Sequence, residues 1–322
     1  MASPARRESK TEDGKISSIT YAGLVWSDIT DPNPAAMAIL ARDYRFHSLD
    51  LDSCLSTMQL TKIEDHDDHL FVVLQIPLLG DQGIIGCEQV SMFLGNNYLV
   101  TLHPSSLSTI STLFQSCMDN EKDRSALMKS SAYLAYRIID NLADDISAIL
   151  DNVQTSLNSL ESVVFNEKKS SARPINLARR QIATLRRIVY PLELYIGDLS
   201  KAQKFSKEDL KIYFSDVRHK VGKISARIEE MKEIVEIYND TDFITSSNRT
   251  NTVLSFLTLI FTLTLPAALV AAIYGMNIPI PAALSPGALT YFGTYTSLLV
   301  VFIFMLVPTL IMVAYFYRRG WF

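Results

Sequence analysis

The chain has 322 residues, and its 30 basic and 34 acidic side chains give a formal net charge of −4 at pH 7. This balance excludes a strongly basic nucleic-acid-binding protein, so no nucleic-acid partner is expected. The three cysteines include no CxxC pair, which excludes a disulfide scaffold and is typical of a reducing compartment.

The first 15 residues are polar and lack the apolar stretch of a signal peptide, so we expect a disordered lead-in over 1–15. A mixed domain of the α+β class is expected over 16–207. Its predicted strands are the short β-like runs at 21–26, 70–76, 90–94 and 98–102. Gly95-Asn96-Asn97 predicts a hairpin turn between the last two.

Two histidines and three carboxylates stand together in Asp65-His66-Asp67-Asp68-His69. Such side chains can bind zinc. The segment leads directly into a predicted strand, where alternate side chains face opposite sides of the sheet. The sequence therefore favours a solvated charged turn over a zinc site.

Two helices are predicted next, because apolar residues recur at steps of three and four over 134–164 and again over 177–203. Pro191 predicts a kink in the second helix. The break at 168–174 separates the two helices, which together form a helical hairpin at the end of the domain.

A stalk helix is predicted from about residue 208, because an a/d seam runs for about four heptads. The seam residues are Leu210, Phe214, Val217, Val221, Ile224, Ile228, Met231, Val235 and Tyr238. No proline occurs between Pro191 and Pro266, so one helix can continue over 208–274 into a membrane.

Two membrane spans are predicted, because no charged residue or histidine occurs from Thr250 through Tyr317. Residues 253–274 and 289–317 are each long enough to cross the hydrocarbon core. Residues 275–288 form an uncharged connection, and 318–322 form a basic tail. Arginines before the first span and after the second predict a multi-pass protein of the inner or plasma membrane with both termini cytoplasmic. A buried hairpin of a soluble protein is disfavoured.

Asparagines bracket the first span at Asn251 and Asn277. An amide at each mouth of an otherwise apolar tube suggests an ion pore. Asparagine also caps helix ends well. The sequence leaves both interpretations open.

The segment Tyr274-Gly275-Met276-Asn277 resembles the signature of the CorA family of divalent-cation channels, at the end of the first of two C-terminal spans. Further similar blocks are 21–32, 46–55, 62–74, 93–103, 213–216, 247–251 and 318–322. The resemblance implies a funnel-shaped homopentamer with an α/β/α cytoplasmic domain, embedded in a lipid bilayer. Mg²⁺ would be both the transported and the regulatory ion, and Co²⁺ or Ni²⁺ would also pass. The cluster at 65–69 would be structural.

The resemblance also assigns roles to individual residues. Gly275, Met276 and Asn277 would form the selectivity filter. The pore-lining and gate residues would be Asn251, Leu254, Leu257, Phe261, Leu265, Ala268 and Ala272. Asp216 would be a regulatory metal ligand, and Asp240 matches another acidic position of the stalk.

One departure from the family pattern concerns the outer loop, where members commonly carry an acidic residue soon after the motif. Here the loop IPIPAALSPGALT has no carboxylate, which weakens electrostatic capture of cations. A ZntB-like Zn²⁺ transporter coupled to protons therefore stays as an alternative, as does a membrane-anchored sensor without transport. The sequence contains no catalytic constellation, so an enzyme is not expected.

Overall fold

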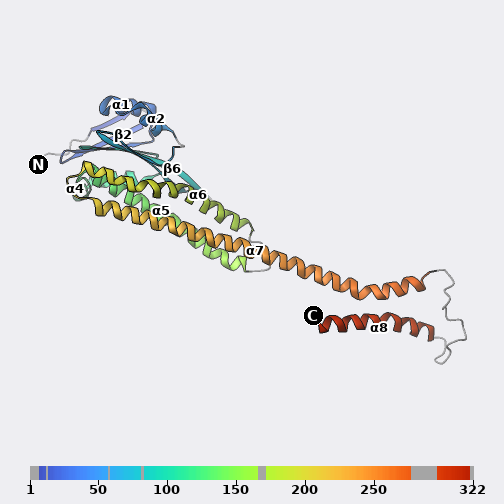
Figure 1. The fold of residues 1–322 in the computed structure, drawn as a ribbon. Helices are drawn as coiled ribbons and strands as arrows, with labels where there is room; N and C mark the ends of the chain where they lie inside the picture. The colour runs from blue at the N-terminus through green and yellow to red at the C-terminus, as the bar shows by residue number, and fades with distance from the viewer. Residues whose placement is uncertain are drawn as a thin grey trace. The chain divides into compact units, whose positions relative to one another are not determined.

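The computed structural model describes residues 7–11, 14–56, 59–80, 83–165, 172–276 and 296–319. The chain divides into two units, Met1–Asp242 and Phe243–Phe322. Figure 1 shows the elements in chain order by colour.

The N-terminal unit is built on a seven-stranded sheet in the order β1-β2-β3-β7-β6-β5-β4. Neighbouring strands are antiparallel except β3 and β7, which are parallel. The strands are β1 (Arg7–Thr11), β2 (Gly14–Tyr21), β3 (Leu24–Thr30), β4 (Lys62–Asp65), β5 (His69–Leu79), β6 (Ile85–Gly95) and β7 (Tyr98–His103).

Both faces of the sheet are buried, which explains the nearly continuous apolar sequence of β5. Leu70 and Val72 belong to one core cluster, whereas Phe71 and Val73 belong to a second. Successive side chains of a strand point to opposite faces, so the two clusters lie on opposite sides of the sheet.

Helices cover both faces, which confirms the predicted mixed α/β/α domain. Helices α1 (Pro34–Tyr44) and α2 (Ser48–Leu55) lie on one face, and α5 (Ser131–Val164) and α6 (Ala172–Ile196) lie on the other (Figure 1). The remaining elements of this unit are α3 (Ser108–Asp119), α4 (Glu121–Leu127) and the 3₁₀ segment η2 (Gly197–Phe205). The helix expected over 177–203 thus ends at Ile196, and η2 follows it.

The predicted stalk helix is present as α7 (Lys211–Tyr274). All nine seam residues predicted from the sequence are buried, in the same core cluster as the apolar faces of α5 and α6. Polar contacts flank this packing: the Lys220 Nζ lies 2.9 Å from the Asp144 carboxylate, and the Arg227 guanidinium lies 2.7 Å from that of Asp151. The seam therefore holds α7 against helices of its own chain.

Two local expectations differ from the structure. The predicted strand 21–26 is wrong: Tyr21 ends β2, and Leu24 begins β3. Ala22 and Gly23 form the turn between them with positive φ angles of 48° and 86°, as a two-residue hairpin requires. Residues 7–11 form β1 inside the expected disordered lead-in. Because β1 pairs with β2 through backbone hydrogen bonds, it can form without the apolar pattern by which strands are predicted from sequence.

The second unit contains the C-terminal part of α7 and helix α8 (Thr296–Arg318). Each holds a segment long and apolar enough to span a membrane, with mean hydropathy of 2.3 and 2.6 respectively, and neither segment is buried. Residues 289–295 of the predicted second span lie outside the described residues.

Candidate functional site

The face of α7 that carries the predicted pore residues is exposed within the single chain. At about 100° per residue, the positions from Asn251 to Gly275 fall within an arc of about 120°. The large members of this line, Leu254, Leu257, Phe261 and Leu265, are 44–69% exposed. A row of large apolar groups this exposed requires cover from lipid or from further protein.

Threonines in the same span satisfy their hydroxyls within the helix. Thr258 donates to the Leu254 carbonyl over 2.8 Å, and Thr262 donates to the Thr258 carbonyl over 2.7 Å. Thr264 donates to the Ile260 carbonyl over 3.0 Å. These bonds remove the cost of unpaired donors in hydrocarbon.

The predicted filter stands where α7 ends. Tyr274 is the last helical residue, and the Gly275 amide still donates to the Ala271 carbonyl over 2.9 Å. A Cβ added at Gly275 would lie 3.1 Å from that carbonyl oxygen, so a larger residue would crowd the last turn. Met276 is exposed. Asn277 lies outside the described residues.

Asp216 is exposed on α7, beside a cluster of tyrosines. Tyr213 of α7 contacts Tyr136 of α5, with ring centroids 5.1 Å apart. Burial raises the pKa of Tyr136, and the charges of Asp140 and Asp216 raise it further. Lys220, one turn after Asp216, pairs instead with Asp140 and Asp144. Among the described residues, no basic group forms an ion pair with Asp216.

Asp240 lies elsewhere on α7 and has different neighbours. Twenty-four residues separate it from Asp216, which corresponds to about 36 Å along a helix. The two carboxylates of one chain therefore cannot share an ion. Asp240 lines a pocket between α6 and α7 together with Arg186 and Lys232, and these positive charges oppose cation binding there.

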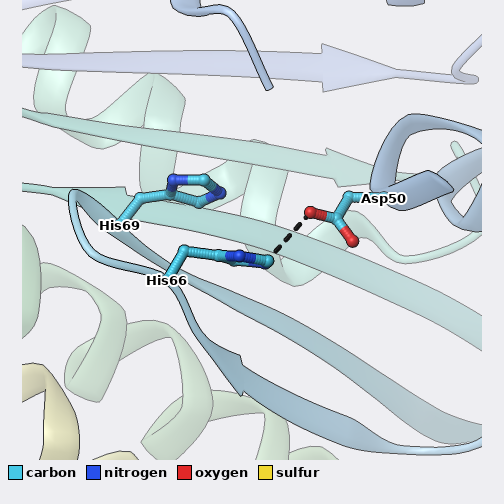
Figure 2. Close-up of side chains that lie close together, drawn as sticks. All are labelled: Asp50, His66 and His69. Atoms are coloured by element: carbon cyan, nitrogen blue, oxygen red, sulfur yellow. Dashed lines mark ion pairs between the residues drawn. The ribbon is translucent and has the colours of Figure 1, made fainter. Parts of the chain in front are cut away.

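The structure also places the histidine cluster at the turn from β4 to β5. The expectation of a solvated turn fits Asp67 and Asp68, which are exposed, and is wrong for His69, which is 5% exposed. His69 is the first residue of β5 and packs against Phe46. The sequence also gave no sign that Asp50 of α2 lies beside His66 and His69 (Figure 2).

A sequence profile of the family described as CorA-like Mg²⁺ transporter protein matches residues 21–318. The cobalt/magnesium transport protein CorA of Thermotoga maritima is 28% identical over 284 residues, which cover 86% of this chain and 77% of that protein.

Two solved structures share the fold. The complete CorA magnesium transporter of Methanocaldococcus jannaschii superimposes with a TM-score of 0.76 at 20% identity, over 99% of this chain and 98% of that chain. The cytoplasmic domain of ZntB from Vibrio parahaemolyticus superimposes with a TM-score of 0.57 at 16% identity, over 78% of this chain and all of that chain. The profile match extends through both units and includes Gly275-Met276-Asn277, and the chain therefore belongs to the CorA-like Mg²⁺ transporter family.

Proposed function

We propose that this chain forms a homopentameric Mg²⁺ channel in the inner or plasma membrane, closed by Mg²⁺ on the cytoplasmic side. One observation carries the proposal: in a chain of this transporter family, the apolar residues expected to line a pore lie on one face of α7, within a span that is exposed on all sides. The relative named as a cobalt/magnesium transporter supports Co²⁺ as a second cargo, and we include Ni²⁺ for its similar size and charge.

Assembly around an axis would cover the exposed line of α7. In a bilayer, helices associate through close packing and through hydrogen bonds, since lipid is as apolar as leucine. Five copies of α7 would direct Leu254, Leu257, Phe261 and Leu265 toward a shared lumen, and α8 would face lipid. The lumen would then be a narrow hydrophobic constriction, which closes to ions when water leaves it.

The orientation of the spans follows from the flanking charges. Arg249 precedes the first span, Arg318 and Arg319 follow the second, and no charged residue stands between them. Cationic residues are retained on the cytoplasmic side. We therefore place both termini and the α/β domain in the cytoplasm, with 275–288 outside.

Selectivity would reside in a ring of five Asn277 side chains at the outer mouth. Mg²⁺ gives up its water shell reluctantly. Neutral amide oxygens can accept hydrogen bonds from the bound waters and hold the hydrated ion weakly enough for release. A carboxylate ring would bind the ion more tightly and slow its departure.

Feedback would act through Asp216, which is exposed and without an ion pair among the described residues. A Mg²⁺ ion between Asp216 and an acidic group of a neighbouring copy would neutralise two carboxylates that otherwise repel. Filling the site would favour the closed population, and emptying it would favour open states.

Two other functions make different predictions. A ZntB-like transporter would move Zn²⁺ with a proton gradient. The similarity in fold between this chain and the ZntB cytoplasmic domain is compatible with this function. A membrane-anchored sensor would move no ion at all. The intact Gly275-Met276-Asn277 motif favours the Mg²⁺ channel over both.

The test is ion flux into liposomes that contain the purified chain. We expect Mg²⁺, Co²⁺ and Ni²⁺ to enter without a pH gradient, and Zn²⁺ entry not to depend on one. Asn277→Ala removes all five amides of the proposed ring and should reduce Mg²⁺ entry more than about tenfold. Loss of only two hydrogen bonds to the hydrated ion, at about 1 kcal/mol each, would already weaken its binding by more than tenfold.

The matched control is Asn152→Ala, which removes an exposed amide from α5 and should leave flux unchanged. Normal flux through assembled Asn277→Ala would refute the filter. Flux of Zn²⁺ alone, driven by protons, would favour the ZntB-like function, and an absence of all flux would favour the sensor.

A further inference from the structure

Three potential metal ligands meet between α2 and the turn from β4 to β5. Asp50 comes from the first turn of α2, His66 from the turn and His69 from the start of β5 (Figure 2). One ligand atom from each lies within 4.8 Å of the other two. The Asp50 Oδ2 and the His66 Nε2 are 3.1 Å apart.

Two of these side chains are deeply buried and carry unsatisfied polar atoms. Asp50 is 4% exposed and His69 is 5% exposed. Among the described residues, the Asp50 Oδ2 and the His69 Nε2 have no hydrogen-bond partner, and the contact of Asp50 with His66 lacks hydrogen-bond geometry. A buried polar atom without a partner destabilises the fold, because it has lost its hydrogen bonds to water. A cation between these atoms would satisfy all three side chains at once.

The surrounding contacts orient the histidines for this role. The His69 Nδ1 lies 2.6 Å from the Asp68 carboxylate, which can only accept, so Nδ1 carries the proton and the Nε2 lone pair faces the cluster. This is the carboxylate–histidine arrangement that supports metal-bound imidazoles. The His66 amide donates to the His69 carbonyl over 2.9 Å, and Lys204 donates to the His66 carbonyl over 2.8 Å. The turn is thus fixed from two sides.

The ligand set selects the class of ion. Imidazole nitrogens suit Zn²⁺ and related transition ions, whereas Mg²⁺ prefers six oxygens. Bond lengths of 2.0–2.2 Å place tetrahedral zinc ligands about 3.3 Å apart. The 3.1 Å between Asp50 and His66 is close to this spacing. The ligand atom of His69 lies within 4.8 Å of the other two, so it would approach them by up to about 1.5 Å through side-chain rotation. His66 is about one-third exposed, but its Nε2, like the Asp50 Oδ2 and the His69 Nε2, is buried.

We propose that Asp50, His66 and His69 form a Zn²⁺ site in the N-terminal domain, separate from the ion pathway and from the Mg²⁺ feedback carboxylate. The site goes beyond the proposed transport function, since it would bind a transition metal rather than the cargo. It would join α2 to the β4–β5 turn and so stabilise the α2 face of the sheet. The alternative is a metal-free cluster held by the stacked rings of His66 and His69, whose centroids are 4.6 Å apart.

The test is Zn²⁺ retention by the full chain purified in detergent. After removal of metals, the protein is dialysed against micromolar Zn²⁺ with millimolar Mg²⁺, which occupies oxygen-only sites, and its metal content is measured by mass spectrometry. We expect wild type to retain one more Zn²⁺ per chain than Asp50→Asn or His69→Gln. The control His219→Gln removes an exposed histidine of α7 and should match wild type. Equal Zn²⁺ content in all four proteins would overturn the site.

A second measurement tests the site even where the variants of the buried residues Asp50 and His69 fail to fold. His66→Gln changes the most exposed of the three ligands, so its fold should survive. Zn²⁺ should raise the thermal unfolding temperature of wild type and of His219→Gln, and should leave that of His66→Gln unchanged. Co²⁺ bound in place of Zn²⁺ should show tetrahedral absorption bands in wild type and lose them in His66→Gln. An equal Zn²⁺-induced rise in all three would also refute the proposal, whatever the flux assays show.

Discussion

The Nε2 of His103 lies 3.3 Å from the Asp28 carboxylate, and both side chains are buried between the parallel strands β7 and β3. The other ring nitrogen of His103 lies 2.9 Å from the Pro104 carbonyl and must donate to it. In the neutral imidazole the Nε2 lone pair would therefore face a carboxylate. Only the protonated ring can donate to both oxygens.

We predict that this pair makes the stability of the N-terminal domain depend on pH. Burial lowers the pKa of His103, but the hydrogen bond and charge of Asp28 outweigh it, and the pKa is raised above 6.5. A raised folded-state pKa stabilises the fold fully below the unfolded value of about 6.5, and this contribution is lost as pH rises through the folded value. The free energy of unfolding should therefore fall from pH 6.5 upward.

The fluorescence of buried Trp26 can follow this unfolding, in a Trp321→Phe background that removes the other tryptophan. Asp28→Asn should destabilise the domain by about 2 kcal/mol at pH 6, the usual value for a hydrogen bond to a charged group, and should flatten the pH dependence. His219→Gln, at an exposed position, should keep the slope. A slope that persists in Asp28→Asn would assign the effect to another group.

A second prediction concerns the hydrophobic constriction of the proposed pore. Leu257→Asn should let water into the closed lumen, because an amide replaces a large apolar group on the exposed line of α7. The measurement is Mg²⁺ flux into liposomes. At high internal Mg²⁺, the flux through the variant should reach about the level that wild type shows at low internal Mg²⁺.

The control for this variant is Leu259→Asn, which makes the same change about 160° around the helix from Leu257. It should leave closure intact. If both variants conduct equally at high Mg²⁺, the effect is a general loosening of the span. If neither does, the gate lies at another level of α7.

A third prediction concerns feedback by Mg²⁺. Asp216→Ala should raise the internal Mg²⁺ concentration that halves the flux by about tenfold, the effect of losing roughly 1.4 kcal/mol of binding. Asp216→Lys should shift it the other way, because an ammonium group beside the neighbouring copy's carboxylate imitates the bound ion.

Flux measured against internal Mg²⁺ gives the midpoints for both variants. Glu230→Ala removes another exposed carboxylate of α7 and should leave the midpoint in place. An unchanged midpoint in Asp216→Ala would remove this residue from the sensor and leave the channel itself untouched.

Structural elements are predicted best from the sequence where their buried residues recur at a regular interval. The seam from Leu210 to Tyr238 was predicted from steps of three and four, and each of its residues is buried. The turn at Ala22 and Gly23 was missed because the apolar run YAGLVW continues across it. Its positive φ angles come from the pairing of β2 with β3, which no local pattern specifies.

The candidate sites were predictable to different degrees. The apolar line of α7 is assigned by the family resemblance and has the spacing of one helix face, so it can be proposed from the sequence. Asp50 is 16 residues from His66, and α2 brings it there only because the sheet and its covering helices fold together. A pairwise contact of this kind has no periodic signature, and the histidine motif alone suggested an exposed turn.

The line from Leu254 to Gly275 offers a passing ion no side-chain oxygen between the two asparagines that bracket it. A bare divalent ion there would lose most of its hydration energy with nothing to replace it. In the proposed pore, the ion must therefore travel as a complex with its own water. Discrimination along this stretch would follow the radius of the hydrated particle, so Mg²⁺ and Co²⁺ would move at similar speeds despite their different preferences for protein ligands.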